Sequence, residues 1–413
     1  MLVEFEGFAF VEGGVVAPQG FMAAGVHCGI RQNKDKKDLS LLTAAGPVPA
    51  AAVYTRNKVK GAPLGVTKAH LENGYATGVI VNSGIANTCC ADGAEKAEGM
   101  CEIAADYLGI PVGDMLVAST GVIGEPLPLE PVREGFPSLA TALDKTPEGG
   151  TAFAEGIMTT DTHAKEVAVE FTLHGRTCRV GGCAKGSGMI HPNMATMLSF
   201  LTTDVKISPA MLQSALSRVV DETFNMVSVD GDTSTNDCCM IFASGEAGNP
   251  EIISSGKDYE TFLNALYAVL MNLSRMIAGD GEGATRLIEC AVTGAKTGAD
   301  AKAVAKSVIG SNLLKAAIFG ADANWGRALC AIGYADADVD VTKVEMAFAS
   351  EAGMLPVCEN GAGVPFSEEK AKEILSKDEV KLLIDLHDGP GQATAWGCDL
   401  TYDYVRINGD YRS

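Results

Sequence analysis

The residues with the clearest chemical potential lie in one glycine-rich stretch at 185–198, which reads KGSGMIHPNMATML. Its threonine, Thr196, follows the small residue Ala195. A threonine hydroxyl is a weak nucleophile near neutral pH unless a base lies beside it. An N-terminal threonine carries such a base in its own α-amino group, whose reference pKa is about 7.7–8. We therefore hypothesise that the chain cuts itself between Ala195 and Thr196, so that Thr196 becomes the nucleophile of an acyl transfer.

The same stretch has two other interpretations. A Gly-Ser-Gly sequence after a lysine can be an ordinary loop, or a cradle whose backbone amides hold a phosphate. The P-loop spacing GxxxxGK[ST] is absent, because Lys185 comes before the glycines. Judged alone, the stretch leaves the choice between a structural loop and a catalytic one open.

Two further turns carry residue types that acyl transfer uses. An apolar segment at 115–118 runs into Thr120-Gly121. A tetrahedral oxyanion needs donors about 2.7–3.1 Å from its developing charge, and a glycine N–H and a threonine hydroxyl supply two. At 281–283 a carboxylate stands between two glycines, which suits a ligand ammonium. Both kinds of turn are commonly structural, so neither establishes a site by itself.

Taken together, these stretches resemble the ornithine acetyltransferases of arginine biosynthesis, also called glutamate N-acetyltransferases. The resemblance includes the run GDGEGAT at 279–285 and continues along nearly the whole chain, from 13–18 to 408–413. It implies a self-cleaved enzyme of the N-terminal-nucleophile type. Residues 1–195 would form an alpha chain and residues 196–413 a beta chain.

The resemblance also assigns roles to individual residues. It makes Thr196 the nucleophile that cleavage after Ala195 exposes. It makes Thr120 and Gly121 the oxyanion hole. The substrate-binding residues that it implies are Thr160, Lys185, Thr196, Glu282, Asn408 and Ser413. The family often ends in threonine, and Ser413 keeps the hydroxyl.

Three details leave assignments open. Thr159 adjoins Thr160 in the same polar turn and is the alternative ligand. Asn324 and Arg327 lie in a loop that also resembles the family, but they receive no role. Ile85 stands where the family commonly has asparagine, so the turn before it is expected to be only structural.

The reaction that the resemblance implies is a ping-pong transfer. Thr196 takes the acetyl group from N2-acetylornithine, releases ornithine, and passes the acetyl group to glutamate. Splitting one transfer into two covalent steps is the purpose of nucleophilic catalysis. Whether acetyl-CoA is also a donor stays open. The alternatives are an N-terminal-nucleophile amidase or aminopeptidase, which hands the acyl group to water, and an uncut metabolite-binding protein.

The elements that must position these residues include both strands and helices. The apolar run at 79–81 predicts a buried strand, and the alternation at 165–173 predicts a half-buried strand. Helices are predicted at 208–224, where Ser-Pro opens the segment, and at 259–277. The fold that the resemblance implies is α/β, with layered sheets flanked by helices and two intertwined fragments.

Two segments are predicted to be strands near the candidate residues. Residues 226–244 predict two strands around the acidic turn at 230–234. This turn does not meet the EF-hand spacing, so we interpret it as a solvated hairpin turn. The C-terminal residues 399–413 alternate like an edge strand.

Composition excludes several classes of protein. The formal net charge of the 413 residues is −20, which argues against binding to nucleic acid or to anionic membranes. No apolar run reaches the roughly 18 residues of a membrane span. The N-terminal residues include acidic side chains and lack the basic region of a secretory signal. We therefore expect a cytoplasmic enzyme.

Cysteine and histidine usage predicts no metal site. The twelve cysteines are dispersed, with no CxxC spacing, and the six histidines form no HExxH motif. Reduced, mostly buried thiols are expected. The resemblance implies no cofactor beyond the small-molecule substrates, and it implies a heterotetramer of two alpha and two beta chains.

Overall fold

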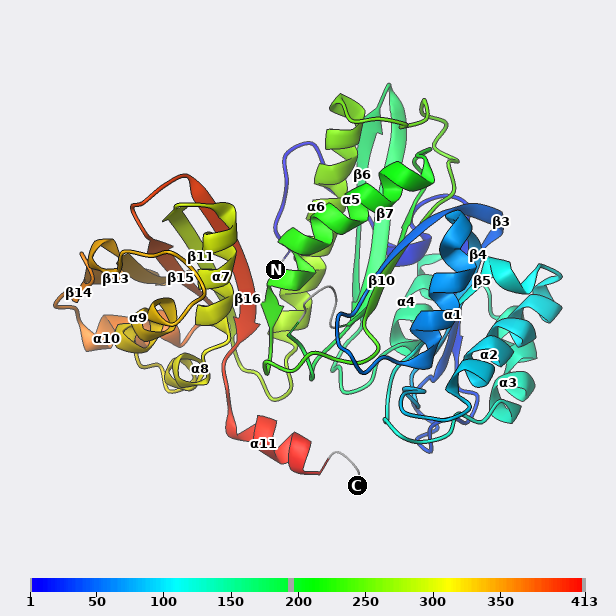
Figure 1. Cartoon of the computed structure of the whole chain (residues 1–413), viewed down its shortest axis with the longest axis horizontal. Helices are drawn as coiled ribbons and strands as arrows, with labels where there is room; N and C mark the ends of the chain where they lie inside the picture. The colour runs from blue at the N-terminus through cyan, green and yellow to red at the C-terminus, as the bar shows by residue number, and fades with distance from the viewer. Residues whose placement is uncertain (1, 192–196, 411–413) are drawn as a thin grey trace. The chain divides into compact units, whose positions relative to one another are not determined.

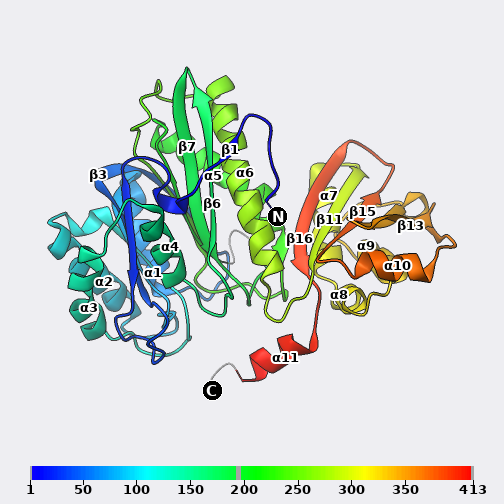
Figure 2. The same ribbon diagram turned by 180° about the vertical axis from the view of Figure 1, so that it is seen from behind.

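The computed structural model describes residues 2–191 and 197–410, and these divide into two compact units (Figure 1 and Figure 2). The first unit holds residues 2–186, 197–224 and 233–273, and the second unit holds residues 187–191, 225–232 and 274–410. Each of the two expected fragments therefore contributes residues to both units. The chain passes from the first unit to the second directly after Gly186.

In the described part of the first unit, nine strands form one sheet, with the path β1-β6-β7-β8-β10-β3-β4-β5 and with β2 beside β3. The strands are β1 (Ala9–Phe10), β2 (Phe21–Val26), β3 (Leu39–Tyr54), β4 (Tyr75–Asn82), β5 (Met115–Ser119), β6 (Lys165–Leu173), β7 (Arg176–Lys185), β8 (Leu198–Thr203) and β10 (Cys238–Ala243). β4 and β5 run parallel, as do β8 and β10. The carboxyl ends of β4 and β5, Asn82 and Ser119, therefore meet at the same edge of the sheet.

Helices cover both faces of this sheet (Figure 1). They are α1 (Ala62–His70), α2 (Gly93–Leu108), α3 (Glu130–Thr141), α4 (Pro147–Gly156), α5 (Pro209–Glu222) and α6 (Lys257–Gly279). Val79 of β4 packs in one apolar cluster with Phe153 of α4. Its neighbour Ile80 packs in another with Met100 of α2 and Phe136 of α3. Because successive strand residues point to opposite faces, β4 is buried on both sides, as its sequence predicts.

The predicted helix at 208–224 is confirmed as α5. The Ser208 side-chain oxygen accepts a hydrogen bond from Met211 N at 3.4 Å, and Pro209 occupies the first turn. This arrangement satisfies an otherwise unpaired amide at the helix start.

Among the described residues, α6 is the one helix whose length and composition would allow it to cross a membrane. However, 78% of its most apolar 18-residue window is buried within the protein. Such burial is typical of a core helix.

In the second unit, seven strands of the described chain form a sheet in the order β14-β13-β12-β15-β11-β16-β9. The strands are β9 (Val227–Ser228), β11 (Leu287–Ala295), β12 (Glu345–Ser350), β13 (Gly353–Glu359), β14 (Ala362–Gly363), β15 (Glu379–Asp385) and β16 (Gly391–Cys398). The helices are α7 (Gly298–Ile309), α8 (Asn312–Phe319), α9 (Trp325–Gly333), α10 (Glu368–Leu375) and α11 (Tyr402–Gly409). Both units combine sheets with covering helices, so the predicted α/β class is confirmed.

Two predictions about strands were wrong. Residues 226–244 do not form a hairpin, because β9 pairs with β16 whereas β10 pairs with β8 and β3. The C-terminal segment is not an edge strand, because Tyr402–Gly409 forms the helix α11. No residue of α11 is buried, so the tail has no apolar face whose spacing would reveal its period.

Candidate active site

The Thr120-Gly121 turn lies at the carboxyl end of β5 and is fastened to the loop that follows β4. Thr120 N donates to Asn82 O at 3.0 Å, and Val122 N donates to Gly84 O at 3.2 Å. Gly121 has φ 129°, and a side-chain carbon there would lie 2.2 Å from Gly84 O, so only glycine fits. Neither the Thr120 hydroxyl nor the Gly121 N–H is hydrogen-bonded within the described chain. Two donors are therefore available on a fixed backbone, which is the arrangement an oxyanion requires.

A buried group of charges lies at the end of β7, where Asp161 joins two predicted binding segments. Its Oδ1 accepts hydrogen bonds from Lys165 Nζ and from Gly186 N, both at 2.7 Å. Its Oδ2 accepts from Thr159 N at 3.0 Å. Burial by itself would raise the pKa of Asp161, but the ammonium groups of Lys185 and Lys165 outweigh it and hold the pKa well below its usual range. Asp161 is thus an anion that fixes the turn at Thr159 next to the strand end at Gly186.

Lys185 is the cation of this group that remains available to a ligand. Its side chain is 7% exposed, yet no hydrogen bond or ion pair joins its ammonium to any residue in the described ranges. Burial lowers the pKa of Lys185, whereas the nearby Asp161 and Asp237 carboxyls oppose the shift. A buried cation gains much from a bound anion, because water screens the pair weakly. Lys185 is therefore suited to a substrate carboxylate.

Asp237 is a second buried carboxyl near Lys185, and the sequence reasoning missed it. Its Oδ2 has no hydrogen-bond partner in the part of the chain that the structure describes. Burial raises the pKa of Asp237 well above its ordinary value, against the influence of Ser234 and Lys185. The only signal for it is weak, an aspartate directly before an apolar strand.

Arg31 is another residue that the sequence reasoning missed. Its Nε donates to Ser83 O at 2.7 Å, and its Nη2 donates to Met158 O at 2.6 Å. It thereby joins the loop after β4 to the residue before the Thr159-Thr160 turn. Its position 52 and 127 residues away from these partners left no local pattern to recognise.

Thr160 lies half-buried in this turn, directly before the buried Asp161. Both backbone polar groups of Thr159 are already hydrogen-bonded, because its N–H donates to Asp161 and its carbonyl accepts from Lys36 Nζ at 3.3 Å. The structure brings Thr160 and Lys185 to one cluster through Asp161, whose hydrogen bonds reach both segments.

In the second unit, Glu282 and Asn408 meet, although 126 residues separate them. Asn408 Nδ2 donates to Glu282 Oε2 at 2.7 Å, and Glu282 is 7% exposed. Glu282 N donates to Ser187 O at 3.0 Å. A side-chain carbon at Gly188 would lie 2.4 Å from the Glu282 carboxylate, so the carboxylate rests directly on the backbone of the glycine-rich stretch. Two predicted substrate-binding residues thus share one hydrogen bond.

Asp230 holds the next residues of this stretch and was wrongly interpreted as part of a solvated turn. Its Oδ2 accepts from Met189 N at 2.6 Å, and its Oδ1 accepts from Ile190 N at 2.8 Å. Tyr404 of α11 donates its hydroxyl to the same carboxylate at 3.3 Å. Met189 adopts φ 57°, in the left-handed region that residues other than glycine rarely occupy. The carboxylate stabilises this turn a few residues before the predicted cleavage point.

Three predicted site residues lie outside the described residues: Ala195, Thr196 and Ser413. Asn324 and Arg327, to which the resemblance gives no role, have structural contacts. Asn324 Oδ1 accepts from Arg327 N at 3.3 Å at the start of α9, and Arg327 Nη1 donates to Leu313 O at 2.7 Å. Within the described ranges, no three His, Cys, Asp or Glu side chains lie close enough to hold a metal ion.

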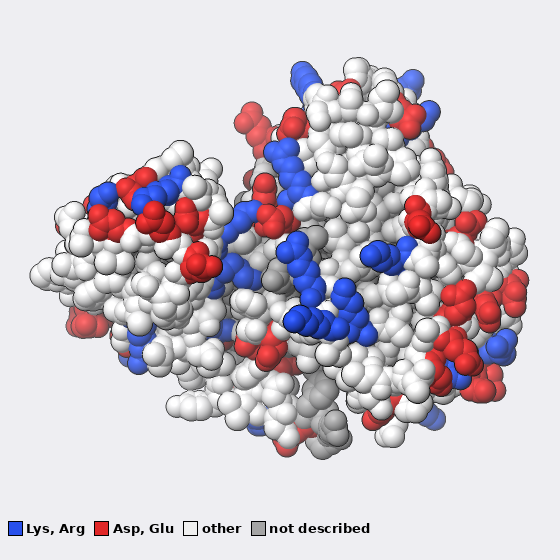
Figure 3. All heavy atoms as spheres, in the orientation of Figure 1, with Lys and Arg blue, Asp and Glu red and all other residues white. Residues whose placement is uncertain are grey.

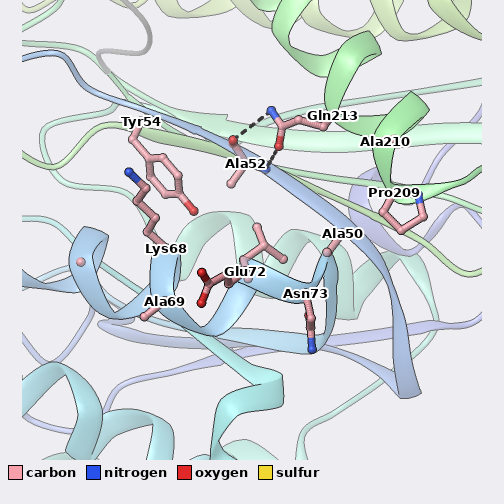
Figure 4. A pocket seen from close by; sticks show the side chains of 13 residues that line it. Ala50, Ala52, Tyr54, Lys68, Ala69, Glu72, Asn73, Pro209, Ala210 and Gln213 are labelled. Atoms are coloured by element: carbon pink, nitrogen blue, oxygen red, sulfur yellow. Dashed lines mark hydrogen bonds between the residues drawn. The ribbon is translucent and has the colours of Figure 1, made fainter.

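A groove of about 740 Å³ opens on the first unit between β3, α1 and α5 (Figure 4). Pairing of β3 with β4 ends at Pro49, and the free edge beyond it is capped by Gln213. Gln213 Oε1 accepts from Ala52 N at 3.3 Å, and its Nε2 donates to Ala52 O at 3.2 Å. The glutamine replaces a neighbouring strand, so we interpret this groove as a covered sheet edge.

Acidic side chains gather over α2 and α3 on the visible face of the first unit (Figure 3). This distribution agrees with the net charge of −20. A surface of this kind repels phosphate backbones.

The α/β fold and the uncommitted donors after β5 suit an acyltransferase. The chain belongs to the ArgJ family, whose model matches residues 22–413.

Relatives match the chain over nearly its whole length. The arginine biosynthesis bifunctional protein ArgJ of Symbiobacterium thermophilum is 50% identical over 406 residues, which cover 98% of this chain and 100% of that protein. The protein of the same name from Bacillus subtilis (strain 168) is 46% identical over 405 residues, which cover 98% and 97%. The crystal structure of the arginine biosynthesis bifunctional protein ArgJ from Bacillus halodurans is 48% identical, with a TM-score of 0.50, over 52% of this chain and 100% of that chain.

Proposed function

We propose that the chain is a glutamate N-acetyltransferase that moves an acetyl group from N2-acetylornithine to glutamate in the cyclic pathway of arginine biosynthesis. The observation that carries the proposal is the pair of uncommitted donors at Thr120 and Gly121, because acyl transfer passes through an oxyanion. No hydrogen bond occupies either donor in the described ranges. The names of the relatives place them in arginine biosynthesis, which supports the choice of substrates.

Cleavage between Ala195 and Thr196 prepares the enzyme. The Thr196 hydroxyl attacks the Ala195 carbonyl carbon, the peptide C–N bond breaks, and the hydroxyl proton passes to the released amine. Water then opens the resulting ester, which leaves a carboxylate on Ala195 and a free hydroxyl and amine on Thr196. The new amine is the base that the hydroxyl needs.

The transfer uses the same hydroxyl twice. Thr196 Oγ attacks the acetyl carbonyl of N2-acetylornithine, the amide C–N bond breaks, and ornithine leaves with the proton that the Thr196 amine relays. The glutamate amine then attacks the acetyl ester, the C–O bond breaks, and the proton returns to Thr196 Oγ. Thr120 and Gly121 stabilise the oxyanion of both steps.

The remaining predicted residues bind substrate in this proposal. Lys185 binds the α-carboxylate that both substrates share, and Thr160 binds beside it. Glu282 favours the ornithine ammonium. Asn408 and Ser413 contribute from the C-terminal tail.

The length of a solved relative supports cleavage. The Bacillus halodurans chain is matched over its entire length by 52% of this chain. Residues 196–413 make up 218 of the 413 residues, which is the same proportion within about one per cent. A chain of that size is expected of a separated fragment.

Mass spectrometry and an acetyl-transfer assay test the proposal together. Wild-type protein should give two fragments that part after Ala195, and it should acetylate glutamate with N2-acetylornithine as the donor. Thr196→Ala should remain one chain and be inactive. An intact wild-type chain with full activity would contradict the proposal, whereas an intact, inactive chain would favour a metabolite-binding protein. Release of acetate without transfer to glutamate would favour an amidase.

The relatives are called bifunctional, which supports a second activity for this chain. We propose that acetyl-CoA also acylates Thr196, so that the enzyme acetylates glutamate without N2-acetylornithine. An assay with acetyl-CoA and glutamate as the only substrates tests this. We also propose an assembly of two alpha and two beta chains, which a native mass measurement would check.

A further inference from the structure

The side chain of Asn236 lies beside the oxyanion turn and is hydrogen-bonded through every group it has. Its Nδ2 donates to Ser119 O at 2.9 Å and to Ala86 O at 2.6 Å. Its Oδ1 accepts from Thr88 Oγ1 and from Thr235 Oγ1, both at 2.6 Å. Carbonyl oxygens can only accept, so Nδ2 must face the two carbonyls. The amide therefore has one orientation.

This amide has no room to move. Asn236 is 5% exposed, and a side-chain carbon added at Gly61 would lie 2.5 Å from its Nδ2. Ser119, whose carbonyl it holds, directly precedes Thr120 and Gly121. Ala86, its other partner, belongs to the loop whose Gly84 carbonyl accepts from Val122 N. Asn236 thus joins the residue before the oxyanion turn to the loop against which that turn is hydrogen-bonded.

In the sequence, Asn236 comes shortly before β10, which pairs with β8, the strand that begins two residues after Thr196. Asn236 is followed by Asp237 and then by Cys238, the first residue of β10. Cys238 N donates to Met197 O at 3.0 Å, and β10 runs parallel to β8 from there. Met197 is covalently bonded to Thr196. Few covalent and hydrogen bonds therefore separate Met197 from Ser119, and they pass through the side chain of Asn236.

We propose that Asn236 is a positioning residue, which fixes the Thr120-Gly121 donors relative to the segment that begins at Thr196. This inference rests on the proposed function. The side-chain amide of Asn236 is fully used by Ser119, Ala86, Thr88 and Thr235, so it acts through the turn. It acts on kcat because a displacement of about 1 Å between catalytic groups can lower a rate roughly 100-fold. Substrate binding should change little.

The test compares Asn236→Ser with Asn249→Ser in the full-length protein. Asn249 is a matched control, because it is 4% exposed and its Nδ2 also donates to two carbonyls, those of Lys206 and Pro250. Its Oδ1 accepts from Lys206 N at 2.8 Å. Both variants lose comparable buried hydrogen bonds, so their Tm values should fall by similar amounts.

We expect Asn236→Ser to lower kcat for acetyl transfer about 10- to 100-fold with KM within about threefold of wild type. It should also slow cleavage, whereas Asn249→Ser should leave both rates near wild type. Thr88→Val, which removes one hydroxyl donor to Asn236 Oδ1, should lower kcat by a smaller factor with less loss of Tm. It serves as the test should Asn236→Ser fail to fold.

The two failures can be told apart. An active wild type with an unchanged kcat in folded Asn236→Ser, or in Thr88→Val if the first is unfolded, would overturn the Asn236 inference alone. An equal loss of kcat in Asn249→Ser would do the same. A wild type that neither cleaves nor transfers acetyl would overturn the proposed function and this inference with it.

Discussion

The turn at Gly121 in the first unit and the turn at Gly188 in the second unit are both crowded where a side chain would begin, but by different groups. At Gly121 a side chain would meet backbone, since Gly84 O lies 2.2 Å from the added carbon. At Gly188 it would meet the Glu282 carboxylate at 2.4 Å, which is the end of a flexible side chain. The Gly121 turn cannot accommodate a side chain unless the backbone after β4 and β5 moves. The Gly188 turn can accommodate one if Glu282 changes its rotamer.

The surroundings of the two turns differ in the same way. The first unit holds its candidate residues at strand ends, with buried partners such as Asp161 and Asn236. The second unit holds Glu282 partly through Asn408 of α11, a helix without a buried residue. Rigid donors suit an oxyanion, whose position must be fixed in advance. Adjustable contacts suit a site that accepts an ornithine ammonium and a glutamate carboxylate in turn.

Gly121→Ala should have the largest effect on the reaction. The added carbon forces the turn away from Gly84 O, and φ 129° is itself unfavourable for alanine. We expect kcat to fall roughly 10²–10³-fold, the loss typical of one oxyanion donor. Steady-state kinetics on the cleaved protein measure this. Gly113→Ala is the control, since nothing lies within 4 Å of its added carbon. Equal losses of kcat in both variants would show that the Gly121 turn has no particular role in the reaction.

Gly188→Ala should have a smaller effect that falls mainly on KM. The Glu282 carboxylate must shift, and under the proposed function this weakens its hydrogen bond to the substrate ammonium by about 1.5 kcal/mol. We therefore expect KM for N2-acetylornithine to rise roughly tenfold with kcat nearly unchanged. Gly298→Ala, also with nothing within 4 Å, is the matched control in the second unit. A loss of kcat as large as that of Gly121→Ala would show that the two turns are equally rigid.

Asp230→Asn should slow cleavage by a still smaller factor. An asparagine keeps one acceptor oxygen and loses the other, so the amides of Met189 and Ile190 can no longer both be satisfied. A left-handed methionine costs about 1–2 kcal/mol, and the carboxylate offsets that cost. We expect a threefold to tenfold slower loss of precursor in a gel time course, consistent with such energies. Adding Met189→Gly should restore the rate, because glycine adopts φ 57° freely.

Asp232→Asn provides the control for charge at this turn, since Asp232 carries a neighbouring carboxylate but is itself exposed. A normal cleavage rate in Asp230→Asn would show that the turn at Met189 does not limit cleavage. A slow rate that Met189→Gly leaves unchanged would assign the effect to charge rather than to backbone conformation.

The sequence was sufficient for a strand that is buried on both faces. The apolar run at 79–81 predicts a buried strand, which β4 confirms, and Asn82 and Ser119 at the ends of β4 and β5 lie at the same edge of the sheet. Burial on both faces leaves a strong pattern in such strands. The same holds for α5, whose Ser208 cap is visible in the sequence.

The supporting residues could not be predicted, because their partners are distant in sequence. Arg31 bonds to Ser83 and Met158, and Asn236 bonds to Ser119. Neither set of contacts leaves a repeating pattern in the sequence. The wrong hairpin at 226–244 has the same cause, since the partner of β9 is β16, about 170 residues further on. Strand pattern indicates pairing but does not identify the partner.

The smallest expected effect is a pH dependence of KM, which tests whether Lys185 in the first unit stays charged. The Lys185 ammonium faces the carboxyls of Asp161 and Asp237 and the cations of Lys165 and Arg31. Burial is the largest influence and lowers the pKa of Lys185 below its ordinary value of 10.5. Protonated lysine therefore predominates at low pH and is lost as pH rises through the lowered pKa.

Under the proposed function, KM for N2-acetylornithine should accordingly rise severalfold with increasing pH at values below 10.5. Lys185→Arg should flatten this rise even if its KM is higher throughout, because a guanidinium stays charged across the range. KM measured across the pH range with both proteins decides the matter. An unchanged rise in Lys185→Arg would assign the titration to another group. A flat profile in the wild type would show that the nearby carboxyls of Asp161 and Asp237 keep Lys185 protonated across the range, so that the first unit holds the charge of Lys185 as firmly as it holds the backbone.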